Sequence, residues 1–293
     1  MIRTSLQHRW SGFAEPLAAQ LRIDRTGLTP VPRRWMRRTR WLAWAAIVLL
    51  YAAGWGESTV AALHVLAGAE PARVELGPQT VQAQALQLAF DGIFVLIALG
   101  VLLAFRRWPR PSTPAEPATW RARWRTFFVA SVAVGVGFVL MGLAAKFTEN
   151  LIAYPYPDVE GVAAAVLRGA ASAMAGPMEE TALLGVVVVA LRRAGYSWII
   201  VCITAACVRV PFHLYYGWEA LLVSVWAVLL VALYRRTGTL APIVAEHATW
   251  NLLTTPQIAE VGNILKITAI AVGARIAITA ITPRTRRSDN GSR

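Results

Sequence analysis

The stretch "GPMEET" (residues 176–181) places two adjacent carboxylates inside one of the most apolar regions of the chain. The text "GVAAAVLRGAASAMA" precedes it, and "ALLGVVVVAL" follows it. A charge at the centre of a bilayer costs roughly 3 kcal/mol on insertion scales, so an ionisable group there indicates a functional site by default. Two questions follow: whether these apolar blocks are membrane spans, and which other polar groups accompany the glutamates.

The composition answers the first question. Of 293 residues, 56% are hydrophobic and only 15% are charged, well below the quarter or so that is usual for soluble domains. The apolar residues form long blocks, which predicts an all-α, polytopic membrane helix bundle with the lipid bilayer as its surroundings. The net charge of +13 does not indicate nucleic acid, because the arginines cluster between the apolar blocks. Cys202 and Cys207 lie in one such block, so no disulfide framework is expected.

A spanning helix needs about 20 mostly apolar residues. Eight segments approach this length: Trp41 to between Gly56 and Leu66, Ala85 to Phe105, Phe127 to Lys146, a stretch within Val162 to Leu191, Ser197 to Tyr215, Trp218 to Tyr234, Leu240 to Leu253, and Val261 to Ile281.

Basic and non-basic loops alternate along the chain, as the positive-inside rule requires of eight crossings. The basic clusters are Arg33, Arg34, Arg37, Arg38 and Arg40; Arg106, Arg107, Arg110, Arg121, Arg123 and Arg125; Arg192 and Arg193; Arg235 and Arg236; and Arg284, Arg286 and Arg287. The intervening loops carry Glu70, Arg73 and Glu75; Glu149, Asp158 and Glu160; Glu219; and Glu260. The pattern predicts a multi-pass protein of the cell membrane with both termini cytoplasmic.

The same pattern predicts three parts. Residues 1–40 form a basic cytoplasmic segment, residues 41–283 form a single transmembrane domain with a motif-bearing core at about 161–255, and residues 284–293 form a short basic tail. Residues 109–117, "PRPSTPAEP", read as a short cytoplasmic linker.

Gly176 and Pro177 are expected to divide the fourth segment, because proline lacks a backbone N–H and is tolerated in the first turn of a helix. A helix beginning at Pro177 would place Glu179 and Glu180 in its first turn, where the macrodipole favours negative charge.

Few polar residues interrupt the predicted spans: Asp91, Arg168, Glu179, Glu180, Arg209, His213, Glu246, His247 and Asn251. Arg209 and His213 are four residues apart, which stacks them on one helix face, and His247 and Asn251 have the same spacing. Such groups can do hydrolytic work. A glutamate can take a proton from water, two histidines can bind a metal or polarise a carbonyl, and an asparagine amide can donate to an oxyanion.

Each of these residues also has a simpler interpretation. A single intramembrane histidine is often a hydrogen-bond donor between helices, and a glutamate pair can relay cations or protons. Asp91 reads as a buried structural group, and Arg168 as pairing with a carboxylate or snorkelling. Glu246 projects about 100° away from His247 and reads as an orienting or packing residue.

The order of three short motifs nevertheless resembles a known family. "GPMEETALLG" (176–185), "RVPFHLYYG" (209–217) and "EHATWN" (246–251) are similar to the motifs of the CAAX protease and bacteriocin-processing family, the Abi-type intramembrane proteases that include Rce1-like prenyl-protein endopeptidases. The resemblance spans about Ala171 to Asn251. That family carries these motifs in spans four, five and seven, which fits the count of eight.

The resemblance implies roles for five residues. Glu179 and Glu180 match the glutamates of the first motif, one of which activates the attacking water, and His213 matches the histidine that works with it. His247 and Asn251 match the residues that form the oxyanion site. The resemblance leaves open whether a divalent metal such as zinc is held by Glu180, His213 and His247, or whether the glutamates act without a metal.

The chain departs from the family pattern at two positions. Leu184 stands where the first motif usually has an arginine, and Arg209 stands where the second usually has an aromatic residue, although Phe212 still places an aromatic ring beside His213. We hypothesise that Arg209 supplies, from the fifth span, the cation that usually comes from the fourth. It would keep one glutamate ionised while the other acts as base.

The function predicted from the sequence is that of an intramembrane endopeptidase acting on a peptide or protein substrate. An inactive family member that serves as a membrane scaffold or peptide-immunity protein shares every sequence feature and stays open as the alternative. A small transporter is less favoured, because carriers often show internal repeats and none is detected here. The sequence identifies no prenyl pocket, and helix counting weakly favours a cavity that opens outward.

Overall fold

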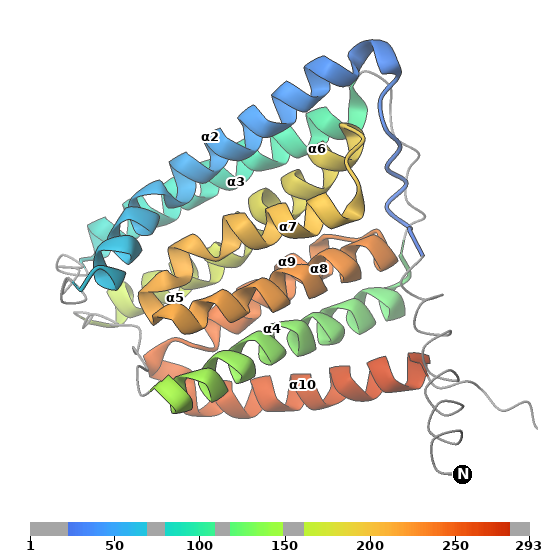
Figure 1. The fold of residues 1–293 in the computed structure, drawn as a ribbon. Helices are drawn as coiled ribbons and strands as arrows, with labels where there is room; N and C mark the ends of the chain where they lie inside the picture. Colours follow the sequence, from blue (N-terminus) through green and yellow to red (C-terminus); the bar gives the residue numbers. More distant parts are fainter. Residues whose placement is uncertain (1–22, 69–79, 109–117, 149–160, 282–293) are drawn as a thin grey trace, which may run out of the picture.

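The computed structural model describes residues 23–68, 80–108, 118–148 and 161–281, and every regular element in these ranges is a helix. Figure 1 shows the helices lying side by side as one bundle. In chain order they are α2 (Arg33–Leu66), α3 (Val81–Arg107), α4 (Trp120–Thr148), α5 (Gly161–Glu179), the π-helix η1 (Glu180–Val186), α6 (Val187–Arg193), α7 (Trp198–Arg209), the 3₁₀ helices η2 (Pro211–Tyr216) and η3 (Trp218–Leu222), α8 (Val223–Thr237), α9 (Ala241–Leu252), the 3₁₀ helix η4 (Pro256–Ile258) and α10 (Ala259–Ile281).

The prediction of a polytopic helical membrane protein is confirmed. Among the described residues, six helical stretches are long and apolar enough to cross a bilayer: Arg33–Leu66, Val81–Arg107, Trp120–Thr148, Gly161–Arg193, Trp218–Thr237 and Pro256–Ala280. All eight predicted segments are helical, but α7 and α9 have only 12 residues each. The count of eight complete spans is therefore not confirmed.

The bundle has a basic end, which we define by Arg33 at the start of α2, Arg106 at the end of α3, Arg121 near the start of α4, Arg193 at the end of α6 and Arg235 near the end of α8. These helix ends lie on the right in Figure 1, and we call the opposite side the far end.

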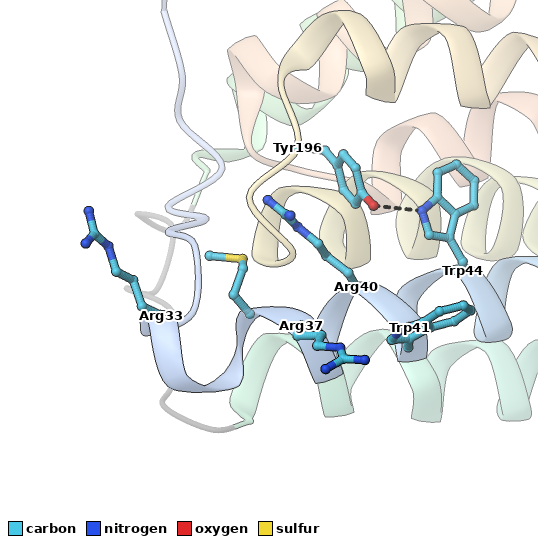
Figure 2. Close-up of a pocket in the computed structure, with 7 residues that line it drawn as sticks. Arg33, Arg37, Arg40, Trp41, Trp44 and Tyr196 are labelled. Atoms are coloured by element: carbon cyan, nitrogen blue, oxygen red, sulfur yellow. Dashed lines mark hydrogen bonds between the residues drawn. The ribbon is translucent and has the colours of Figure 1, made fainter.

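Hydrogen bonds join the helix termini at the basic end. The Arg193 guanidinium donates to the carbonyl oxygens of Phe105 and Trp108. Figure 2 shows the start of α2 facing the turn after α6, where Trp44 Nε1 donates to the Tyr196 hydroxyl at 2.9 Å. Arg40 Nε donates to the carbonyl oxygen of Ala194 in the same turn.

The helix that carries the glutamates runs through the centre of the bundle. The stretch Gly161–Arg193 is largely buried, whereas α10 lies at the edge against α4. Large apolar side chains instead cover the outer surface, as expected where the solvent is lipid. They include Leu49 on α2, Leu96 on α3, and Ile264 and Ile278 on α10.

The prediction that a new helix begins at Pro177 is wrong. Pro177 lies inside α5, which continues to Glu179 and passes directly into η1. Transmembrane helices tolerate an internal proline because local π or 3₁₀ adjustments and neighbouring helices satisfy the freed backbone groups. The helix widens into a π-helix at Glu180, three residues after the proline. The glutamates therefore lie in mid-helix, and the macrodipole argument for their position does not apply.

The prediction that Arg209 and His213 share one α-helix face is also wrong. Helix α7 ends at Arg209, and His213 lies in the following 3₁₀ helix, η2. Pro211 causes this change because its nitrogen cannot donate to the carbonyl oxygen four residues earlier. The two residues remain adjacent through a different contact, described below.

Several predictions fall outside the described residues. These concern Glu70, Arg73, Glu75, Arg110, Glu149, Asp158 and Glu160, the linker at 109–117, the tail at 284–293 with Arg284, Arg286 and Arg287, and residues 1–22 of the N-terminal segment. Within the proposed 1–40 segment, α2 already begins at Arg33.

Candidate active site

A backbone contact between two helices brings the first and third motifs together. A Cβ atom built on Gly176 of α5 would lie 2.3 Å from the amide nitrogen of Ala248 and 2.8 Å from the carbonyl carbon of His247, both on α9. Only glycine leaves room for so close an approach. The glycine of "GPMEET" therefore lets α9 place His247 beside the glutamates that follow it.

Glu180 is the centre of a buried polar network. Its side chain is fully buried, and its Oε1 accepts a hydrogen bond from Arg209 Nη1 at 2.8 Å. The Nδ1 atom of His247 lies 2.7 Å from the same oxygen. Arg209 Nη1 is also 3.9 Å from Glu179 Oε2. The structure thus places the Arg209 cation between both carboxylates, while Leu184 is buried in the apolar core.

Each histidine is oriented through Nδ1. His213 Nδ1 lies 2.8 Å from the carbonyl oxygen of Arg209, so it donates to that oxygen. His247 uses Nδ1 toward Glu180. In both rings only Nε2 is left for a water or a substrate. Phe212 packs against His213 with ring centroids 4.3 Å apart.

Trp226 contributes an indole ring to the site, and we did not predict this residue from the sequence. The Trp226 ring on α8 lies 4.7 Å from the Arg209 guanidinium carbon, in cation–π geometry. Its centroid is 5.1 Å from that of His247 and 5.9 Å from that of His213. Tryptophans at predicted span ends read as interfacial. Trp226 instead lies in the middle of a predicted span, and this position was the sequence feature that set it apart from the interfacial tryptophans.

The candidate residues face a cavity of about 1370 Å³. Glu179, His213, His247 and Asn251 line it, while Glu180 lies behind the wall with no exposed surface. Asn251 is half-buried, and its backbone carbonyl accepts a hydrogen bond from the Ser172 hydroxyl of α5. Elements α5, η2 and α9, which carry the three motifs, therefore meet at this cavity.

The remaining intramembrane polar residues divide between the cavity and the core. Asp91 is buried and accepts a hydrogen bond from Gln87 at 2.7 Å, but it also lines the cavity, as does Arg168. Glu246 is absent from the cavity wall, and its side chain is buried. Its neighbour His247 does line the wall, in line with the expected divergence of the two side chains.

The metal alternative fits these contacts poorly. Both histidines have the hydrogen-bonded Nδ1 that metal-ligating histidines usually show. However, Glu180, the third proposed ligand, already shares Oε1 between Arg209 and His247. A guanidinium also lies within 4 Å of both carboxylates, where a second cation would be repelled. Across the described ranges, no three His, Cys, Asp or Glu side chains are grouped to hold a metal.

The cavity holds one more charge that the sequence reasoning missed. Lys266 lines it from α10, with its Nζ atom 2.7 Å from the Thr254 hydroxyl. The signal was available, because a lysine within an otherwise apolar span is a functional-site hypothesis in itself.

Residues 161–253 match the family model described as Type II CAAX prenyl endopeptidase Rce1-like. The matched range contains all three motifs and confirms the family resemblance for that part of the chain. Searches of curated proteins and of solved structures found no match.

Proposed function

We propose that the chain is an intramembrane endopeptidase that hydrolyses a peptide bond in a cavity within the bilayer, without a metal. The observation that carries the proposal is the division between the two glutamates. Glu180 is sealed in a network with Arg209 and His247, whereas the neighbouring Glu179 reaches the cavity. Adjacent carboxylates in such different surroundings are suited to different tasks.

In this mechanism Glu179 is the base. It takes a proton from a water molecule in the cavity while the water oxygen attacks the carbonyl carbon of the peptide. The tetrahedral intermediate then collapses, the C–N bond breaks, and the proton held by Glu179 passes to the leaving amine. The products are a carboxylic acid and an amine, and Glu179 returns to its ionised state.

His213 and Asn251 act on the other atoms. His213, which keeps Nε2 for the cavity, holds the attacking water together with Glu179. Asn251 and His247 lie one turn apart on α9, both at the cavity wall. From there the Asn251 amide donates a hydrogen bond to the oxyanion that forms on the carbonyl oxygen. His247, whose Nδ1–H is directed to Glu180, donates to the same oxyanion from Nε2 in its protonated, imidazolium form.

The Glu180 network positions these groups. Arg209 neutralises Glu180 inside a low-dielectric bundle, where an unpaired carboxylate would be very costly. Glu180 in turn orients His247, and the carbonyl of Arg209 orients His213. Arg209 thereby takes over the function that the family assigns to an arginine at the place of Leu184.

The lining of the cavity supports a proposal for the direction of substrate entry. Its lining includes Ser58 near the end of α2, Thr80 before α3 and Thr254 after α9, all at the far end. Because the arginine-rich ends mark the cytoplasmic side, we infer that the cavity opens outward from a cell membrane in which both termini are cytoplasmic. The substrate is a peptide or protein segment with apolar side chains, which suits the Phe138 and Ile270 lining.

The test compares two buried glutamates in proteoliposomes supplied with a library of apolar membrane peptides. Products are identified by mass spectrometry. Glu179→Gln should lower cleavage by about 10² to 10⁴, the usual contribution of a general base. The matched control is Glu246→Gln, a buried glutamate away from the cavity wall, which should cleave at nearly the wild-type rate. Cleavage that survives Glu179→Gln would show the site is wrong. Saturable peptide binding without cleavage by the wild type would support the inactive scaffold.

A further inference from the structure

Lys266 is a buried cation inside the membrane-spanning part of α10. It is 9% exposed, although the surrounding helix presents Ile264 and Leu265 outward. A lysine in a span usually snorkels toward the interface. Lys266 instead lies across the end of α9, with its ammonium 5.1 Å from the Trp250 ring centroid. Its side chain is thus directed into the cavity.

The ammonium group keeps hydrogen-bonding capacity there. It has three N–H donors, and one of them is used by the Thr254 hydroxyl at 2.7 Å. No carboxylate of the described residues lies within 4.0 Å of it, since the ion pairs in these ranges are confined to Glu179, Glu180, Arg209 and His247. The charge costs roughly 3 kcal/mol in the bilayer. An anionic ligand beside the ammonium group would offset this cost.

Thr254 links this cation to the candidate active site. Its amide donates to the carbonyl oxygen of Asn251 in the turn that ends α9. His247, Asn251, Thr254 and Lys266 all line the one cavity. A molecule that contacts Lys266 therefore extends along the wall toward His247.

We propose that Lys266 binds a carboxylate of the peptide substrate and determines which peptides the cavity accepts. The inference rests on the proposed function, because that function makes a peptide the occupant. Carboxylates are the anionic groups that unmodified peptides carry, either at the C-terminus or on Asp and Glu side chains. Trp250 and Ile267 beside Lys266 give the peptide an apolar surface next to the charge.

The test measures binding separately from cleavage. Purified Glu179→Gln protein in phosphatidylcholine nanodiscs is titrated with pairs of fluorescent apolar hexapeptides. One pair differs in a C-terminal acid or amide, and a second pair, both amides, differs in an internal Asp or Asn. We expect one acid to bind about tenfold to a hundredfold more tightly than its neutral partner, the range for a hydrogen bond to a charged group. The pair that shows the difference identifies the source of the carboxylate.

Variants then assign the preference. Lys266→Met should abolish it, and Lys266→Arg should retain most of it. The chain has only one other lysine, Lys146, at the exposed end of α4, so Lys146→Met is the matched control and should keep the full preference. A destabilised Lys266→Met protein does not obscure the result, because the two peptides of a pair are compared on the same protein and Lys266→Arg retains the charge.

Three results would overturn the proposal: equal binding of acid and neutral peptides, a preference that survives Lys266→Met, or loss of acid binding when phosphatidylglycerol replaces phosphatidylcholine, which would assign Lys266 to a lipid headgroup. Failure of the proposed endopeptidase function would give a different result from these three. The wild type would then bind acid peptides through Lys266 and release no products.

Discussion

Arg209 Nη1 lies 2.8 Å from Glu180 Oε1, and this contact joins the end of α7 to the π-helix at the centre of the bundle. Both side chains are almost completely buried, at 2% and 0% exposure. Since His247 shares the same carboxylate oxygen, one atom of Glu180 connects three segments that are distant in sequence. The pair is therefore expected to support both the fold and the site.

Removing the cation should reduce stability and activity together. Arg209→Met leaves the Glu180 charge without its partner, which typically costs about 3–5 kcal/mol for a buried pair. We expect a lower midpoint of thermal unfolding in detergent and little peptide cleavage. Arg275→Met, which removes an exposed arginine from α10, is the control and should change neither value appreciably.

A second-site variant tests whether the charge itself is what matters. Leu184 lies on the same helical segment as Glu180 and is buried. Adding Leu184→Arg to Arg209→Met returns a cation to the helix that carries it in the family pattern. We expect the double variant to regain part of the unfolding midpoint and of the cleavage rate. A double variant less stable than Arg209→Met alone would contradict the idea that the two positions exchange one charge.

The sequence was sufficient to predict the helices and the motif residues, but not where one helix type passes into another. Long apolar blocks and alternating arginine clusters predict helical spans because the bilayer imposes length and charge rules on each segment separately. The path through Pro177 and Pro211 depends on neighbours that satisfy the backbone, so local rules predicted a helix start at Pro177 and a continuous α-helix at Pro211. The structure shows neither.

The contents of the site divide in the same way. Five polar residues stand out within apolar segments of the sequence, and the structure brings them together: Glu179, Glu180, His213, His247 and Asn251. Trp226 belongs to the site through its contacts with Arg209 and both histidines. Such contacts come from the packing of α8 against its neighbours, which no spacing rule within one helix predicts.

Chelators should leave the activity intact. In the proposed mechanism the Arg209 guanidinium lies where a metal would otherwise balance the two carboxylates. Cleavage by proteoliposomes is therefore expected to be unchanged after incubation with EDTA or 1,10-phenanthroline, and the purified protein should carry much less than one equivalent of zinc by plasma mass spectrometry. Loss of cleavage that added zinc restores would instead assign Glu180, His213 and His247 to a metal.

Labelling should reveal which side the cavity faces. In a background lacking Cys202 and Cys207, Ser58→Cys places a thiol at an exposed position of the cavity wall, and Arg37→Cys places one at the basic end. In intact cells, a membrane-impermeant maleimide should modify the first thiol, and the second only after permeabilisation. The reverse pattern would mean that the cavity opens to the cytoplasm.

The close contact at Gly176 gives a graded test of the geometry. Gly176→Ala puts a methyl group within 3 Å of the His247 and Ala248 backbone, so α9 must shift away. Overpacking of this kind typically costs about 1–3 kcal/mol. Gly169, on the same helix, is the matched control, because its added Cβ would meet only Leu252 Cδ1 at an ordinary 3.5 Å.

Unfolding midpoints and cleavage rates per folded molecule should then separate the two variants. Gly169→Ala is expected to keep both values, since alanine favours a helix over glycine by up to about 1 kcal/mol. Gly176→Ala should lose cleavage even at temperatures where it stays folded, because His247 moves relative to Glu180. If folded Gly176→Ala protein cleaved peptides as fast as Gly169→Ala, the contact between Glu180 and His247 would not be needed for catalysis.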